Sequence, residues 1–168
     1  MRGYERYELN WTVPQVVIHP KNLTILPIVN NVVYRINTER DNEYFILECR
    51  QQSGWDSFVP GHGMLVWHID YNPNIWDRNV VNRDPSHQYV DIGEAKGGTS
   101  STPAAGFPFP GSGKVTKLTG MTSWSGYAID LPLTDIAEVD GSVVLKVAGG
   151  KSDITPTVLV VSVYVTQS

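Results

Sequence analysis

The feature that most constrains the fold of this chain is a repeated pattern of short runs rich in Val, Ile, Tyr and Trp, separated by clusters of Pro, Gly, Asn and Asp. Apolar residues do not recur with the spacing of an amphipathic helix, so the pattern predicts an all-β protein. We expect strands at residues 15–18, 23–28, 32–37, 43–50, 64–70, 89–94, 114–118, 127–133, 142–147 and 157–164.

Two of these segments, EYFILEC (43–49) and GMLVWHID (63–70), are apolar almost throughout. Strands of that composition are buried on both faces, so we expect both in the centre of a sheet. A chain of 168 residues fits one domain that buries about 70% of its unfolded surface. The predicted architecture is an antiparallel β-sandwich or partly open barrel. Tyr4 and Tyr7 have the spacing of a short helical turn before it, which Pro14 would end.

Charge and hydropathy exclude two classes of partner. The chain carries 13 Lys and Arg against 17 Asp and Glu, for a net charge of −4, and its basic residues are scattered. Because a phosphate backbone is bound by a concentrated basic surface, we expect no nucleic-acid partner. The longest aliphatic run, at 158–165, is too short to span a membrane, and no signal peptide is visible.

Cys49, the single cysteine, lies in an apolar run and is expected to be a buried, unreactive thiol.

A zinc site within this chain is not expected. The sequence has neither H-E-x-x-H nor C-x-x-C. Along one extended strand, His62 and His68 would lie about 20 Å apart, too far to share an ion. We interpret His68, between Trp67 and Ile69, as a hydrogen-bonded histidine of the core or of a cleft. A general base is the alternative interpretation.

The stretch DYNPNIWD (70–77) is a candidate calcium loop. Asp70, Asn72 and Asn74 stand at alternate positions and Asp77 follows, which resembles the first half of a loop that offers oxygen ligands to a hard cation. The loop lacks the usual glycine and bidentate glutamate, because Ile75 and Val81 stand there. Further ligands, such as Asp84 or Asp91, would be needed. The alternative is an ordinary polar turn.

Four longer stretches stand in a consistent order: YERYELNWTVP (4–14), EYFILECRQQSGWDSFVPGHGMLVWHID (43–70), NVVNRDPSHQYVDIGEAKG (79–97) and FPFPG (107–111). Together they resemble the immune inhibitor A family of secreted bacterial zinc metallopeptidases, and this is more specific than any single short motif. The resemblance covers residues 4–111, with a weaker echo to Gly150. Three positions depart from the family pattern: Asn10 replaces a glycine, Cys49 an asparagine and Lys96 an aspartate.

The resemblance implies that the H-E-x-x-H helix, with the zinc ligands and the general base, lies before Met1. Residues 1–14 would then be a linker or the helical end of that zinc subdomain, 15–150 a β-rich domain and 151–168 a tail or added strand. The chain would pack on the upstream catalytic subdomain and shape its cleft without being catalytic itself. Some of the side chains of Tyr4, Tyr7, Leu9 and Trp11 should therefore be exposed in the isolated chain.

For the parent protein, the resemblance implies secretion or a place at the cell surface and zinc-dependent hydrolysis of a protein or peptide substrate. The rival hypothesis is a stand-alone β-sandwich that binds glycans or protein surfaces. It would use exposed tryptophans and the long Gly, Pro and Ser-rich loop at 97–113. Packing in the core is the alternative use of the tryptophans, which are Trp11, Trp55, Trp67, Trp76 and Trp124.

Overall fold

A computed structural model describes residues 1–97 and 103–151 of the chain. In these ranges eight strands form two sheets and the helices are short, so the predicted all-β class is confirmed. The predicted strand at 157–164 lies outside them. No helix of the described ranges is long and apolar enough to cross a membrane. In chain order the elements are α1 (Gly3–Glu8), β1 (Gln15–Val16), β2 (Lys21–Ile25), η1 (Ile28–Asn30), β3 (Tyr34–Asn37), β4 (Glu43–Arg50), η2 (Gly54–Asp56), β5 (Gly63–Asp70), α2 (Pro73–Asp77), β6 (Val90–Ile92), η3 (Ala104–Gly106), β7 (Leu133–Val139) and β8 (Ser142–Val147).

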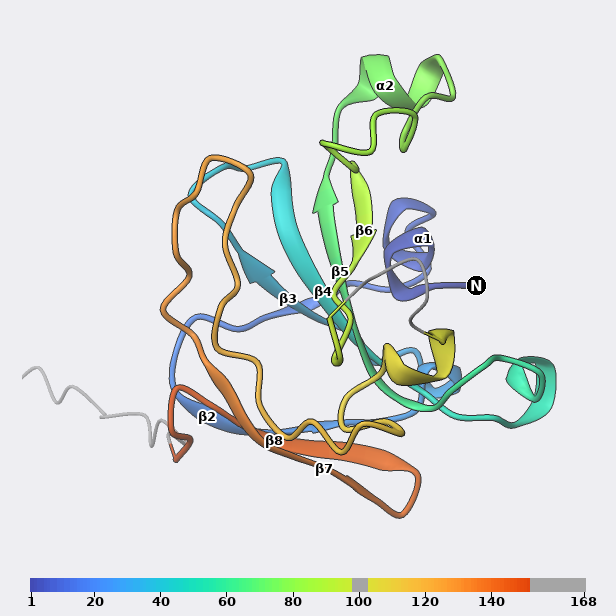
Figure 1. Cartoon of the computed structure of the whole chain (residues 1–168), viewed down its shortest axis with the longest axis vertical. Helices are drawn as coiled ribbons and strands as arrows, with labels where there is room; N and C mark the ends of the chain where they lie inside the picture. Colours follow the sequence, from blue (N-terminus) through green and yellow to red (C-terminus); the bar gives the residue numbers. More distant parts are fainter. Residues whose placement is uncertain (98–102, 152–168) are drawn as a thin grey trace, which may run out of the picture.

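The larger sheet has the strand order β1-β3-β4-β5-β6 and centres on the long antiparallel pair β4 and β5 (Figure 1). Every residue of β4 is buried, and in β5 only Leu65 and His68 are partly exposed. The prediction of two central strands is therefore confirmed. The sequence predicted antiparallel pairing. The pair β1 and β3 is instead parallel, so the larger sheet departs from that prediction at this edge.

Side chains on the two faces of β4 enter different cores, because alternate residues of a strand point to opposite faces. Phe45, Leu47 and Cys49 pack toward the smaller sheet, which has the order β2-β8-β7. Tyr44 and Ile46 pack on the opposite side, in a cluster that includes residues of α1 and η1. Cys49 is fully buried as predicted, and burial raises the pKa of its thiol.

Two strand predictions are wrong in the segment at 114–132. The predicted strands at 114–118 and 127–133 are absent from the described structure, which has only the isolated bridges Leu118–Leu133 and Thr122–Ala128 there. Apolar residues of the segment, such as Ile129, are buried against the core, so their spacing reflects a loop packed on the sheets. The strand β7 instead begins after Pro132, which has no N–H to donate to a ladder.

The predicted N-terminal helical turn is confirmed as α1, but Pro14 does not end it. Asn10 adopts a left-handed conformation with φ of 56°. The N–H of Trp11 donates to the carbonyl of Arg6, and the N–H of Asn10 donates to that of Tyr7. This pair of bonds is a Schellman motif, which stops a helix by itself. Apart from glycine, asparagine is among the residues that most readily adopt this conformation.

Candidate functional site

The four predicted calcium ligands lie at the end of β5 and in α2, within a lobe that projects beyond both sheets (Figure 1). Asn72 caps α2, and its Oδ1 accepts the N–H of Asn74 at 3.1 Å. The buried carboxylate of Asp70 places Oδ2 2.8 Å from Nε2 of His87. Asp77 is exposed. The structure therefore brings Asn72 and Asn74 together but pairs Asp70 with a histidine.

Calcium binding by these residues stays a prediction, and it would require Asp70 to exchange His87 for the ion. If calcium binds the native state, millimolar calcium should raise the melting temperature, and Asp70→Ala should abolish the rise. The two further ligands considered from the sequence, Asp84 and Asp91, accept backbone N–H groups close by in the chain. A melting curve that a chelator leaves unchanged would make the loop a polar turn only.

A stack of four rings lies beside these residues. The ring of His68 lies 4.3 Å from that of Phe45 and 5.5 Å from that of Trp124, between centroids, with interplanar angles of 16° and 13°. The imidazole of His87 also stacks on the indole, with 4.3 Å between ring centroids and an interplanar angle of 17°. Two histidines therefore stack on Trp124 and connect the segment at 119–131 to β5 and to the projecting lobe.

Each of the two histidines is held by a buried carboxylate. Glu43 is fully buried, and its Oε1 accepts from Nε2 of His68 at 2.8 Å and from the backbone N–H of Trp124 at 2.6 Å. Its Oε2 has no hydrogen bond among the described residues, and the nearest cation is Arg40 at 3.7 Å. The side chain of His68 is 12% exposed, which confirms the interpretation as a hydrogen-bonded, largely buried histidine.

Among the described residues, the two histidine–carboxylate pairs have no nucleophile that would complete a catalytic triad. Within the described residues, no hydroxyl or thiol hydrogen-bonds to His68 or His87, and the hydroxyls of Ser123 and Ser125 both donate to Glu39. Nucleophilic catalysis needs the nucleophile within hydrogen-bonding reach of its base. The geometry therefore supports a role in fastening the 119–131 segment over the sheet.

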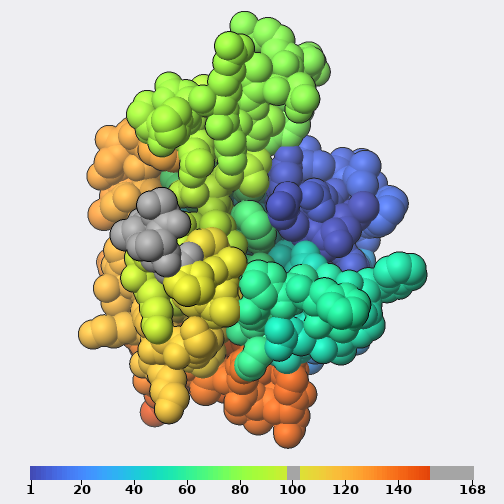
Figure 2. All heavy atoms as spheres, turned by 45° about the vertical axis from the view of Figure 1, so that its right-hand side comes forward, coloured from blue at the N-terminus to red at the C-terminus, as the bar shows by residue number. Residues whose placement is uncertain are grey.

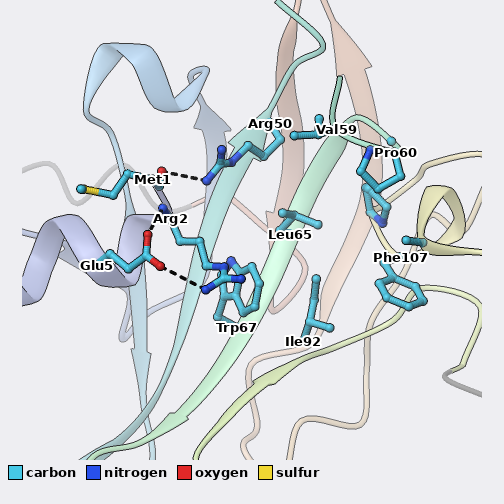
Figure 3. A pocket seen from close by; sticks show the side chains of 13 residues that line it. Met1, Arg2, Glu5, Arg50, Val59, Pro60, Leu65, Trp67, Ile92 and Phe107 are labelled. Atoms are coloured by element: carbon cyan, nitrogen blue, oxygen red, sulfur yellow. Dashed lines mark hydrogen bonds and ion pairs between the residues drawn. The ribbon is translucent and has the colours of Figure 1, made fainter. Parts of the chain in front are cut away.

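An apolar cavity of about 480 Å³ lies on the opposite face of the larger sheet, beside the start of α1 (Figure 3). Its polar rim comes from Arg2, Glu5 and Arg50. The guanidinium of Arg2 lies 4.9 Å from the ring centroid of Trp67, whose buried Nε1 has no hydrogen-bond partner among the described residues. The apolar walls come mainly from Val59, Pro60, Leu65, Trp67, Ile92, Phe107 and Pro108. They suit a hydrocarbon side chain.

A buried ion pair ties this rim together. Glu48 is fully buried, accepts the backbone N–H of Gly3 and lies 3.1 Å from Nε of Arg50. The other guanidinium nitrogens of Arg50 donate at 2.8 Å to Asp56 and to the backbone carbonyl of Met1. One arginine therefore connects the chain start, β4 and η2. The sequence signal for such a pair is the two charged residues at alternate positions, Glu48 and Arg50, that follow the apolar run at 44–47.

Exposed apolar side chains follow α1 in the chain, and with Val29 of η1 they make up what we call the N-terminal patch: Leu9, Trp11, Val13 and Val29. Trp11 is 60% and Val13 86% exposed. The side-chain amide of Asn31 donates to the carbonyl of Trp11 at 2.5 Å, so the turn that carries Val29 lies against this segment. The expectation of exposed side chains near α1 therefore holds for Leu9 and Trp11.

Tyr4 and Tyr7 do not belong to the patch. Tyr4 is buried, and its hydroxyl accepts from Nε1 of Trp76. Tyr7 is half-buried and packs edge-on against Tyr44, with 6.0 Å between ring centroids. These two tyrosines therefore anchor α1 to the sheet, and only the residues after them face outward.

The loop at 51–60 presents a second exposed aromatic pair. Trp55, in η2, and Phe58 are exposed almost completely. Figure 2 shows this loop beside the N-terminal segment on one face of the molecule, in agreement with the hydrogen bond from Arg50 to Met1. Among the other tryptophans, Trp67 is buried and Trp76 and Trp124 are partly buried.

Within residues 1–97 and 103–151, no group of three or more His, Cys, Asp and Glu side chains is arranged to hold a metal ion. The chain matches none of the protein-family models, curated proteins and solved structures with which it was compared. Proposals about its function therefore rest on the sequence resemblance and on the geometry of these sites.

Proposed function

We propose that this chain is the non-catalytic, β-rich portion of a secreted zinc metallopeptidase of the immune inhibitor A type, and that it packs against the zinc-binding core of its parent. The observation that carries the proposal is the N-terminal patch. In the resembled family the segment that here reads YERYELNW joins the zinc core to the β-rich part. The exposed side chains of Leu9, Trp11 and Val13 lie in or directly after that segment.

The patch has the physical properties of a docking surface. Burying one large apolar side chain contributes about 1.5–3 kcal/mol, and grouped apolar side chains on a soluble domain mark an interaction site. The backbone that carries the patch is fixed by the Schellman motif and by the bond from Asn31 to Trp11. A surface that is already ordered loses little conformational entropy on binding.

In the parent protein, zinc would polarise the peptide carbonyl and activate a water molecule. The resemblance assigns the ligands and the general base to a helix outside this sequence, so we assign no catalytic residue here. The contribution of this chain would be to support the core and shape its cleft for a protein or peptide substrate.

Two observations test the proposal. The coding sequence upstream of Met1 should encode H-E-x-x-H in the same frame, and an unrelated domain or a stop codon there would contradict the proposal. The purified chain should not hydrolyse casein, because it lacks that helix and its paired histidines are engaged by carboxylates. Hydrolysis that a chelator blocks and that His68→Ala abolishes would overturn this expectation.

The aromatic loop favours a second candidate function, a binding module for glycans or protein surfaces. Trp55 and Phe58 have the exposure that a stacking or anchoring aromatic needs before it binds. This function predicts that the chain is retained on an immobilised polysaccharide or protein and that Trp55→Ser abolishes retention. Equal retention of the wild type and the variant would remove this candidate.

A further inference from the structure

The projecting lobe contains a second cavity, of about 740 Å³, at its outer side. Figure 2 shows the lobe at the top of the molecule, in green. The backbone around the cavity is fixed by turns: Val80 N–H donates to Ile75, Tyr89 N–H to Val81 and His87 N–H to Asp84. The cavity is lined by Ile75, Arg78, Val80, Arg83, Asp84, Pro85, His87 and Tyr89.

Two guanidinium groups of this cavity have free donors. Arg78 uses Nε to bond the carbonyl of Asn74 at 2.9 Å, and its terminal nitrogens have no partner among the described residues. The guanidinium of Arg83 forms no hydrogen bond or ion pair within residues 1–97 and 103–151. Asp84 is the only acidic residue of the lining, and its Oδ1 is occupied by the N–H and the hydroxyl of Ser86.

The imidazole of His87, also in the lining, is already oriented. His87 lies 2.8 Å from Asp70 through Nε2 and stacks on Trp124, so its ring cannot turn freely. The Tyr89 ring lies 4.5 Å from the imidazole and forms an aromatic wall. Together with Ile75 and Val80, it supplies the apolar part of the lining.

We propose that this cavity binds the carboxylate of a ligand with an apolar body, a class that includes the free C-terminal end of a peptide with an apolar last residue. The two arginines would take the carboxylate, since a guanidinium fork matches its two oxygens. The apolar wall would take the hydrocarbon. The two arginines and Asp84 together carry one net positive charge, which suits a monoanion better than a phosphate dianion. This site is independent of the proposed docking to a zinc core.

The test is a titration of the full chain with N-acetylphenylalanine, N-acetylphenylalaninamide and inorganic phosphate, followed by nuclear magnetic resonance. We expect the free acid to bind at least about tenfold more tightly than the amide and to shift signals of the lobe, because charged hydrogen bonds are lost in the amide. Arg83→Gln should weaken binding of the acid about tenfold, and Arg83→Lys should weaken it less. Asp84→Asn should strengthen it.

The matched control is Lys117→Gln, which makes the same charge change at an exposed position outside the lobe and should leave the affinity unchanged. Melting curves of all variants check that each is folded. Equal binding of the acid and the amide would overturn the proposal. So would tighter binding of phosphate, or an Arg83→Gln variant that is folded and binds the acid normally.

Discussion

Replacing Arg50 with methionine is expected to lower the free energy of unfolding by about 3 kcal/mol, because it leaves the buried carboxylate of Glu48 without its cation. The side chain of Arg50 is only 8% exposed. Burial alone would lower its pKa, but the carboxylates of Glu48 and Asp56 hold the pKa of Arg50 above its ordinary value. The substitution also removes the bond to the carbonyl of Met1, so α1 should loosen. Urea denaturation measures the loss.

Two controls separate the buried charge from the lost side chain. Arg2→Met breaks an exposed pair with Glu5, with side chains 49% and 36% exposed, and a contact of the guanidinium with the Trp67 ring. Each should contribute less than about 1 kcal/mol, so the variant should lose less stability than Arg50→Met. The double variant Glu48→Gln with Arg50→Met should be more stable than Arg50→Met alone, because the stranded charge is gone. Equal losses for Arg50→Met and Arg2→Met would show that the ion pair contributes no more than a surface pair.

The variant Trp11→Ser with Val13→Ser should weaken binding to the proposed upstream zinc subdomain about a thousandfold, since apolar anchors at the centre of an interface each contribute about 2 kcal/mol or more. Its own stability should change little, because both side chains are exposed. The matched control is Tyr127→Ser with Val139→Ser, which removes exposed apolar side chains from the 119–131 segment and from β7. Equal weakening by both double variants would remove the patch from the interface.

The parts of the fold that could be predicted from sequence are those where the local pattern and the tertiary environment agree. The strands β4 and β8 have the predicted bounds, Glu43–Arg50 and Ser142–Val147, because a run of apolar residues marks each of them. The start of β5 was predicted to within one residue. Shorter strands such as β6 were predicted at the correct position but with wrong ends. The predicted strand was 89–94, and the observed one is Val90–Ile92.

The segment at 114–132 could not be predicted in the same way. Its apolar residues are spaced as in a strand. Met121 and Ile129, however, are buried because the segment packs as a loop against the core between the two sheets. Whether such a segment joins a ladder depends on which strand edge is free nearby. That information lies in residues far along the chain, so local propensity gave the wrong answer.

The site residues show the same division. Glu48 and Arg50 follow an apolar run in a predicted strand, so these two charged residues could have been predicted to form a buried ion pair. The contacts of Glu43 with His68 and with Trp124 could not have been predicted. These residues lie 25 and 81 positions from Glu43 in the sequence. The family resemblance led us to expect exposure of some of the side chains near α1, without saying which. The burial of Tyr4 follows from its contact with Trp76, which the sequence does not reveal.

Isothermal titration calorimetry of this chain with the polypeptide encoded directly upstream of Met1 tests the docking proposal most directly. We predict a one-to-one complex of micromolar or tighter affinity, with a negative change in heat capacity from burial of the N-terminal patch. The heat should be nearly lost with the Trp11 and Val13 double variant and retained with the Tyr127 and Val139 control. Absence of binding between the two folded, wild-type polypeptides would contradict the proposal that this chain is part of a zinc peptidase.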